Sequence, residues 1–277
     1  SRFDHLDPAE LYRRIDAGEI VGDDGRPIDR GTTPQEHQFV WYHRQLPDEQ
    51  ILPYREEILF ADGDLVVVDK PHFLPTTPSG RYLRETALVR LRIRLDNPHL
   101  APVHRLDSAT AGLVMFTARP GVRGAYQTLF EQRRVDKTYE AVSALPPGWD
   151  ARARTLDGRP VPLVRRDHLH HPGGHVRTAV LAGAEPNSET GVDVLGHGVS
   201  ATGRRVLHTR LTPRTGRMHQ LRVHLAALGI PILGDRRYPV LLPEAPDDEA
   251  LPLQLVAREL AFTDPISGLP RRFRSRR

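Results

Sequence analysis

The stretch from His104 to Leu113 reads HRLDSATAGL, and it carries the most informative group of the chain, the carboxylate of Asp107. Small and polar residues around this aspartate favour a turn. The apolar run from Gly112 to Thr117 follows at once and predicts a short buried strand. A polar turn on a rigid strand can hold a carboxylate at the mouth of a cleft. An aspartate that only caps a turn fits the same residues, so both interpretations stay open here.

A second polar segment, LTPRTGRMHQLRVH, runs from Leu211 to His224. It crowds basic and amide groups into the turn before a helix that we expect from Gln220 to Leu228, ended by Gly229. Helix N-termini with free N–H groups attract phosphate and carboxylate. Arg222 lies in the first turns of this helix and is placed to reach a buried carboxylate. The alternative is a solvated, basic start of a helix.

The rest of the main segment predicts more strands than helices. Strands are expected at residues 58–60, 65–68, 112–117, 138–144 and 206–211, and helices at residues 86–95 and 122–130. Residues 151–203 are rich in Gly, Pro and His and predict only several weak strands. Because strands and helices do not alternate strictly, the expected class is α+β with a mixed, mostly antiparallel sheet, flanking helices and a central cleft.

Residues 1–50 form a separate small unit in this prediction, and residues 55–277 form the main domain. A short helix begins at Pro8 and stops at Gly18, a turn-rich stretch follows, and Phe39 to Tyr42 predicts a strand. This order resembles a degenerate form of the RNA-binding motif of ribosomal small-subunit protein four. An N-terminal extension packed on the main domain is the alternative. The far end of the chain, residues 271–277, is a basic stretch.

Composition excludes several kinds of chemistry. The 277 residues include no cysteine, which removes disulfides, thiolate-bound zinc, iron–sulfur clusters and cysteine nucleophiles. The formal net charge is +4, and only Lys70 and Lys137 of the 39 basic residues are lysines. Arginine pairs bidentately with phosphate and stacks on bases, which suits an RNA partner. No apolar run is long enough to span a bilayer, so the expected location is cytoplasmic, with no membrane partner.

Taken together, these segments resemble the RluA family of pseudouridine synthases, which modify uridines in ribosomal and transfer RNA. HRLDSATAGL is similar to the family's His-Arg-Leu-Asp pattern, and TGRMHQLRVH to its second motif. Three further pieces fit in order: LVVVDKP at residues 65–71, KTYEA at residues 137–141, and PILGD at residues 231–235 followed by Tyr238. The departures are Ala111, where the family usually has Ser, and Met218, where it has Thr or Ser.

The resemblance implies an isomerase whose catalytic residues are Asp107, Tyr139 and Arg222. Asp107 is the expected nucleophile, which acts on a uridine flipped out of the RNA. Arg222 is expected to pair with Asp107, because an opposite charge favours the ionised carboxylate. Tyr139 is expected to cover the base and to handle the proton on its C5 atom.

Arg105 is expected to fill the gap that the flipped base leaves and to contact phosphate. The other residues that the resemblance assigns to RNA binding or to support of the loop are His104, Thr110, Lys137, Arg217, His219 and Leu221. Among these, His104 is expected to hold the loop, and Thr110 to bond backbone near Asp107. The expected partner is RNA, with ribosomal RNA ahead of transfer RNA. A monomer without an obligatory protein partner, metal or organic cofactor is expected.

Two rival functions remain open at this point. A metal-dependent hydrolase would use the histidines at positions 168, 170, 171 and 175, although only Asp167 lies beside them as an acidic ligand. A catalytically inactive RNA-binding protein of the same fold would keep the basic surface and lose the acid. The presence of Asp107, Tyr139 and Arg222 favours the enzyme over this second rival.

Overall fold

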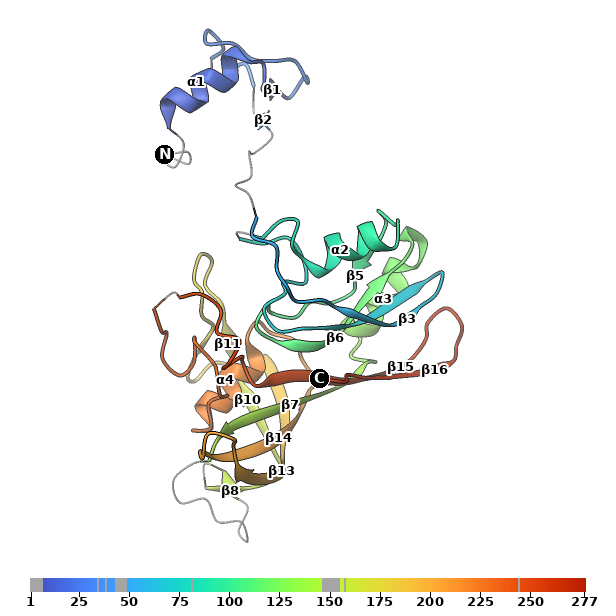
Figure 1. Ribbon diagram of the computed structural model, residues 1–277, viewed down its shortest axis with the longest axis vertical. Coiled ribbons are helices and arrows are strands. Elements are labelled where there is room, and N and C mark those ends of the chain that lie inside the picture. The colour runs from blue at the N-terminus through green and yellow to red at the C-terminus, as the bar shows by residue number, and fades with distance from the viewer. Residues whose placement is uncertain are drawn as a thin grey trace. The chain divides into compact units, whose positions relative to one another are not determined.

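The computed structural model describes residues 7–277, with gaps at residues 34, 38, 43–48, 81, 146–154, 157 and 244. The chain divides into two compact units, Ser1–Glu49 and Gln50–Arg277, both drawn in Figure 1. In the described part of the chain, no helix is both long and apolar enough to cross a membrane.

The first unit is built on one helix and one strand pair. Helix α1 (Pro8–Asp16) begins where the side chain of Asp7 accepts a hydrogen bond of 3.0 Å from the backbone N–H of Ala9. Such an N-cap satisfies a donor that the helix itself leaves unpaired. Strand β1 (Ile20–Gly22) pairs antiparallel with β2 (Val40–Tyr42). The helix and the strand expected here are present, and the resemblance to a ribosomal RNA-binding motif stays a prediction.

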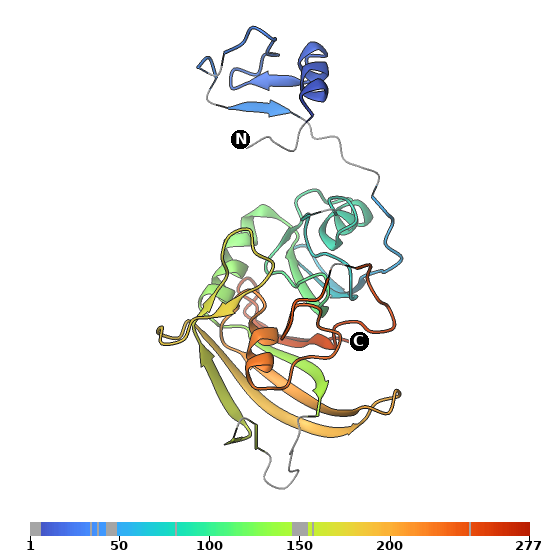
Figure 2. The same ribbon diagram turned by 90° about the vertical axis from the view of Figure 1, so that its left-hand side faces the viewer.

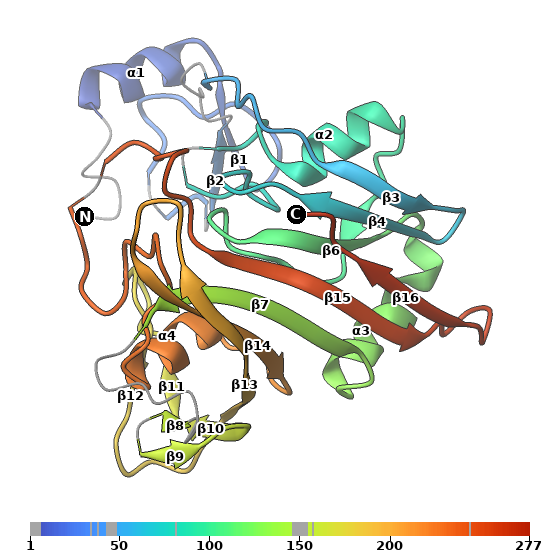
Figure 3. The ribbon, with the colours of Figure 1, turned by 60° about the horizontal axis from the view of Figure 1, so that its bottom comes forward.

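A ten-stranded sheet forms the framework of the second unit (Figure 3). Its order is β10-β13-β14-β7-β15-β6-β4-β3, with β16 paired to β15 and β5 paired to β6. Its strands are β3 (Glu57–Ala61), β4 (Leu65–Lys70), β5 (Ala101–Pro102), β6 (Ala111–Thr117), β7 (Asp136–Ala144), β10 (Leu163–Asp167), β13 (Ser188–Val199), β14 (Arg205–Pro213), β15 (Leu255–Thr263) and β16 (Pro270–Arg274). The pair β15–β6 is parallel and the other pairs described are antiparallel. The expected α+β class with a mixed, mostly antiparallel sheet is confirmed.

Helices and two small hairpins flank this sheet. They are α2 (Ala87–Arg94), the 3₁₀ turn η1 (Pro120–Val122), α3 (Arg123–Glu131), α4 (Gln220–Ala227), the pair β8 (Thr155–Leu156) and β9 (Arg159–Pro160), and the pair β11 (Leu169–His170) and β12 (Ala179–Val180). The hydroxyl of Thr86 caps α2 by accepting from the N–H of Val89 at 3.3 Å. The helices expected at residues 86–95, 122–130 and 220–228 are present, and no end differs by more than one residue.

Strand β4 is buried on both faces, which explains its continuous apolar run. Successive side chains of a strand point to opposite faces of the sheet. Val66 and Val68 pack in one hydrophobic cluster with α2, whereas Leu65 and Val67 pack in another with α3. The two helices therefore cover opposite faces of this part of the sheet.

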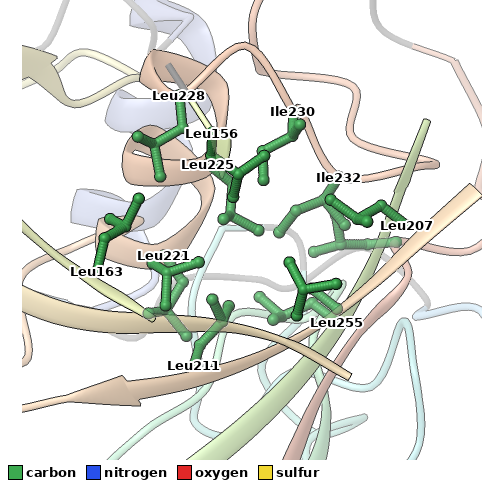
Figure 4. Close-up of a cluster of buried hydrophobic side chains, with 14 residues drawn as sticks. Leu156, Leu163, Leu207, Leu211, Leu221, Leu225, Leu228, Ile230, Ile232 and Leu255 are labelled. Carbon is green, nitrogen blue, oxygen red and sulfur yellow. The ribbon is translucent and has the colours of Figure 1, made fainter. Parts of the chain in front are cut away.

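A third cluster fixes α4 against β13 and β14 (Figure 2). Leu221 and Leu225 of the helix pack with Leu207 and Leu211 of β14 and with Leu255 of β15 (Figure 4). Burial of several leucine side chains contributes about 1.5–3 kcal/mol each to this contact. The N-terminal end of α4, which carries the second polar motif, is thereby held on the sheet.

Two parts of the sheet differ from the sequence-based expectation. Residues 151–203 predicted only weak strands, yet β13 runs over twelve residues, Ser188–Val199. Residues 271–277 were expected to be only a basic end, yet β16 takes Pro270–Arg274 into the sheet beside β15. Strand β15 itself was not predicted. A bulge between Ala257 and Glu259 shifts its alternation of buried and exposed side chains, and such a shift weakens the period-two signal of a strand.

Candidate active site

Asp107 lies in the loop between β5 and β6, with its side chain one-third exposed. Thr110, directly before the strand, closes a turn, since its backbone N–H donates to the carbonyl of Asp107 at 3.1 Å. Leu106 beside it is buried, and its carbonyl accepts from the hydroxyl of Thr76 at 2.8 Å. Thr110 thus bonds backbone near Asp107, as expected, and the bond that forms uses its amide.

A buried lysine binds backbone carbonyls in and beside this loop. Lys70, at the end of β4, is fully buried, and its ammonium donates to the carbonyls of Pro71, Leu74 and Ser108 at 2.9, 2.8 and 3.2 Å. Burial lowers the pKa of Lys70 to about 7, while the charge of Asp107 raises it. Three acceptors around one ammonium fix the backbone next to Asp107. The motif LVVVDKP contains this lysine, but the sequence alone predicted no role for it.

Gly112 lets the loop run straight into β6. Its φ is +110°, and a Cβ built on it would lie 2.3 Å from the carbonyl oxygen of Ala257 in β15. Glycine is therefore required both by conformation and by the close approach of the two parallel strands. This contact connects the loop that carries Asp107 to the centre of the sheet.

Arg222 points from the first turn of α4 toward Asp107. Its side chain is only 5 % exposed, and its Nη1 lies 3.2 Å from Oδ2 of Asp107. Its Nε and Nη2 make a second, bidentate contact to Asp235 at 2.8 and 2.6 Å. Such paired bonds fix a guanidinium in direction as well as in place. The ion pair expected from the sequence is present, and Asp235 is a second partner that was not expected.

Asp235 is itself held by backbone. Its side chain is fully buried, and its Oδ1 accepts from the N–H groups of Arg237 and Tyr238 at 2.8 and 3.1 Å. With Arg222 these donors satisfy both of its oxygens. The PILGD motif contained this aspartate, but only its position against Arg222 in space gives it a function.

His219 stands beside Asp107 as a neutral imidazole. Burial, with Arg222 and Arg237 nearby, lowers its pKa to about 4, although Asp107 acts in the opposite direction. Arg237 donates to its Nε2 at 3.0 Å, so a neutral ring carries its proton on Nδ1, which lies 3.0 Å from the hydroxyl of Tyr238. Its Nε2 is 3.6 Å from Asp107. His219 therefore packs against the carboxylate without donating a hydrogen bond to it.

Tyr139, on β7, packs against two of the hydrophobic clusters, the one under α4 and the one under α2. Burial raises the pKa of its phenol well above the ordinary value, and the negative charge of Asp107 raises it further. The hydroxyl is therefore protonated at neutral pH.

These residues share one cavity of about 290 Å³. Its lining includes Arg105, Asp107, Thr110, Lys137, Tyr139, Arg217, His219, Leu221 and Arg222, all of which sequence reasoning had singled out. Leu255 of β15 also lines the cavity and was missed, because the strand was not predicted. The volume is near the lower end of the range for small-molecule pockets.

His104 is the exception among the residues expected to bind RNA. Its Nε2 accepts from the backbone N–H of Met115 at 3.2 Å, and its ring stacks on Phe130 at 4.8 Å. Burial lowers its pKa to about 3, so the ring is neutral. His104 thus connects the loop to β6 and α3, and it lines a neighbouring hollow instead of this cavity.

The histidine-rich segment forms the hairpin β11–β12. His171 contacts the hydroxyl of Thr178 at 3.2 Å, and its ring meets that of His219 edge-on at 6.3 Å. Among the residues that the structure describes, no group of three His, Cys, Asp or Glu side chains is arranged to hold a metal ion. The hairpin therefore adjoins the cavity through hydrogen bonds and ring contacts.

Comparison with known proteins gives consistent matches. Residues 64–227 match the family model described as RNA pseudouridylate synthase. A protein of Yersinia pestis named dual-specificity RNA pseudouridine synthase RluA is 33 % identical over 217 residues, 78 % of this chain and 97 % of the relative. The protein of the same name from Escherichia coli is 32 % identical over 216 residues, 76 % of this chain and 88 % of the relative.

A protein of Synechocystis described as an uncharacterized RNA pseudouridine synthase is 30 % identical over 238 residues, 86 % of this chain and 76 % of the relative. Among solved structures, human RNA pseudouridylate synthase domain containing 1 superposes with a TM-score of 0.62 at 24 % identity, over 83 % of this chain and 86 % of that chain. This last similarity concerns the fold alone.

Proposed function

The chain belongs to the RluA family of RNA pseudouridine synthases and is an RNA-modifying isomerase, and from that premise we propose that Asp107 is the nucleophile, acting on a uridine flipped out of ribosomal RNA. The observation that carries the proposal is the contact of 3.2 Å between Arg222 and Asp107 inside a cavity that Tyr139 also lines. In this proposal Asp107, Arg222 and Tyr139 each have a separate role in the reaction.

The reaction breaks the bond between N1 of uracil and C1′ of ribose and forms a bond between C5 and C1′. The proton on C5 leaves and N1 gains one, so no atom or electron is exchanged with another reactant. A carboxylate can form a covalent intermediate that splits this exchange into two steps. Attack at C1′, attack at C6 of the base, and a route through a glycal all require a carboxylate at this place. Asp107 is the carboxylate that the cavity offers beside Arg222.

Arg222 and Tyr139 have separate parts in this proposal. Arg222 stabilises the negative charge of Asp107 while the carboxylate is free, before the covalent intermediate forms and after it is resolved, and Asp235 keeps the guanidinium in place. Tyr139 carries a protonated hydroxyl over the base, supported by the raised pKa of its phenol. A hydroxyl of this kind can relay the proton that leaves C5, accepting it on the oxygen while giving its own proton toward N1, which gains one.

Base flipping is supported by the side chains that line the cavity together with Asp107. A uridine stacked in a helix cannot reach a carboxylate held among Leu221, Leu255 and Tyr139, so it must leave the stack. Arg105 is exposed at the rim, where it would fill the vacated space and contact phosphate.

We place ribosomal RNA ahead of transfer RNA as the substrate. The relatives named dual-specificity support more than one RNA site for such a protein, and the family resemblance includes both RNA classes. The test is a map of pseudouridines in cellular ribosomal and transfer RNA, made with and without the protein. We expect at least one position in ribosomal RNA to lose its modification and to regain it when the purified protein is added. Loss confined to transfer RNA would overturn this choice.

A further inference from the structure

A second hollow, of about 560 Å³, opens beside the cavity that holds Asp107. The two share Arg105, Lys137, Tyr139 and residues 215–217 in their linings. The second hollow adds the turn between α3 and β7, with Arg133, and the start of the segment between β14 and α4, with Arg214. It is larger than the first and lies along the same rim.

Hydrogen bonds and a sharp backbone turn hold the walls of this hollow in place. Gln220 accepts at its side-chain oxygen from the hydroxyl of Thr215 at 2.7 Å and from the N–H of Arg217 at 3.0 Å. The N–H of Arg214 donates to the carbonyl of Glu189 at 3.1 Å. On the other wall, Arg133 has a φ of +57°, a left-handed backbone that turns the chain sharply between α3 and β7. The hollow therefore has a fixed frame.

The charge inside the hollow is one-sided. Five cationic side chains line it, those of Arg105, Arg133, Lys137, Arg214 and Arg217, against the single carboxylate of Glu131. Among the described residues, the side chains of Arg105 and Arg133 make no ion pair or hydrogen bond.

The remaining cations are only weakly engaged. The side chain of Arg214 is 70 % exposed, and its Nε lies 3.6 Å from a carboxylate oxygen of Glu189, which is a long ion pair. The Nε of Arg217 donates to the carbonyl of Asn187 at 3.3 Å. Burial lowers the pKa of Lys137, and the charge of Arg133 lowers it further. Like charges thus line one hollow, an arrangement that an anion would stabilise.

We propose that this hollow binds the phosphodiester backbone of the nucleotide next to the target uridine, through Arg133 and Arg214. The inference rests on the proposed function, because a base in the first cavity brings its ribose and phosphate to the shared rim of Arg105, Lys137 and Arg217. The neighbouring phosphate then lies over the second hollow. Arginine forks bind phosphate oxygens bidentately and carry no sequence information, so the site sets the register of the strand and not the choice of base.

The salt dependence of RNA binding tests this site. A labelled 12-nucleotide oligouridylate is titrated with wild-type protein, Arg133→Gln and Arg214→Gln at several KCl concentrations, and Kd is read from fluorescence anisotropy. Each phosphate contact adds about 0.7 to the slope of log Kd against log salt on a single strand. Each variant should lose about that much slope, and Kd should rise about two- to tenfold. Arg133→Lys keeps the charge and should restore most of the slope.

Arg204→Gln is the matched control. Arg204 is exposed in the turn that joins β13 to β14, at the opposite end of β14 from Pro213. Its slope should equal that of the wild type. A thermal melt checks that each variant folds, and Arg214→Gln carries the test if Arg133→Gln does not.

Equal slopes for wild type, Arg133→Gln and Arg214→Gln would overturn the proposal, and so would a higher Kd with an unchanged slope, since the lost contact would then not be to phosphate. Turnover on unmodified large-subunit ribosomal RNA is measured in parallel. Wild-type protein that binds with the expected slopes but makes no pseudouridine in this RNA would count against the proposed substrate and leave the phosphate site standing. Normal turnover with equal slopes would support the proposed substrate and overturn the phosphate site.

Discussion

At the scale of single residues, the candidate site depends on one arginine shared between two carboxylates. Asp235 takes two of the donors of Arg222 and leaves Nη1 directed at Asp107. A buried guanidinium with only one partner could turn in its pocket, whereas a bidentate bond fixes its plane. Asp235 is therefore a positioning residue, acting on Asp107 through Arg222.

Asp235→Asn should lower both stability and activity. It leaves a buried cation with one partner fewer, which should lower the free energy of unfolding by about 2–4 kcal/mol. The misdirected arginine should lower kcat about 10- to 100-fold, with KM for RNA nearly unchanged. Urea denaturation and steady-state turnover measure the two effects. Glu57→Gln is the control, since it removes an exposed pair with Arg276 and should cost less than about 1 kcal/mol. A kcat of Asp235→Asn equal to that of the wild type would show that Arg222 is directed at Asp107 without the charge of Asp235.

At the scale of elements, the loop that carries Asp107 depends on how closely β6 approaches β15. The parallel contact pairs Ala111 with Val256 and Gly112 with Ala257. Strand β6 thereby joins the loop that carries Asp107 to a strand far along the chain.

Gly112→Ala should be strongly destabilising. The new Cβ would meet backbone atoms of Ala257 at 2.3 to 2.8 Å, and φ of +110° is strained for alanine. We expect a loss of about 2–4 kcal/mol in the free energy of unfolding. Gly124→Ala, in α3, meets nothing within 4 Å and should leave stability unchanged or raise it by up to about 1 kcal/mol. Equal melting curves for the two variants would contradict the close packing described.

A second element-scale feature joins α4 to β13. His224 is fully buried, with its Nε2 3.0 Å from the hydroxyl of Ser188 and its Nδ1 2.9 Å from that of Thr190. Burial lowers its pKa to about 4, opposed by Asp167 and assisted by Arg165. The imidazole is neutral in the folded protein at pH 6.

This histidine makes stability depend on pH. The unfolded chain takes up a proton at His224 below about pH 6.5, and the folded chain only near pH 4. The unfolded state therefore binds more protons between these values, and stability is full above pH 6.5 and is lost as the pH falls through this window. Urea denaturation at pH 7, 6 and 5 should show a slope of up to about 1.4 kcal/mol per pH unit from this group. His224→Gln should reduce that slope, and an unchanged slope in His224→Gln would be the contradictory result.

The sequence predicted the elements next to the site better than those that complete the sheet. The resemblance of short motifs to the RluA family singled out Asp107, Tyr139 and Arg222, whereas apolar spacing predicted only the strands and the helix beside them. Lys70 and Asp235 appeared in quoted motifs, but their roles depend on bonds between segments far apart in the chain. Strand β15 was missed because its bulge interrupts the alternation of side chains. Local periodicity carries no information about such long-range pairing.

At the scale of the whole molecule, the described cavity lies within one of the two compact units. All residues that line it, from Arg105 to Leu255, belong to Gln50–Arg277. Strand β15 lies between β7 and β6, so this unit needs its C-terminal strands to complete the sheet.

A fragment of residues 50–277 should therefore fold and keep kcat within about threefold of the full chain, because it contains the whole cavity. We expect the pattern of modified uridines to change, since residues 1–49 are the candidate for choosing the RNA site. Circular dichroism melts test folding, and pseudouridine maps of ribosomal RNA test selection. A folded fragment without any activity would show that the first unit takes part in the chemistry.

The central claim is that Asp107 performs the covalent chemistry. The most direct measurement incubates Asp107→Ala with unmodified ribosomal RNA under single-turnover conditions, counts pseudouridine by mass spectrometry, and measures RNA binding in the same samples. We predict no pseudouridine above background, with Kd for RNA within about threefold of the wild type, because the removed carboxylate contributes to the reaction and not to the phosphate contacts. Pseudouridine formed by Asp107→Ala at a rate near that of the wild type would contradict this account.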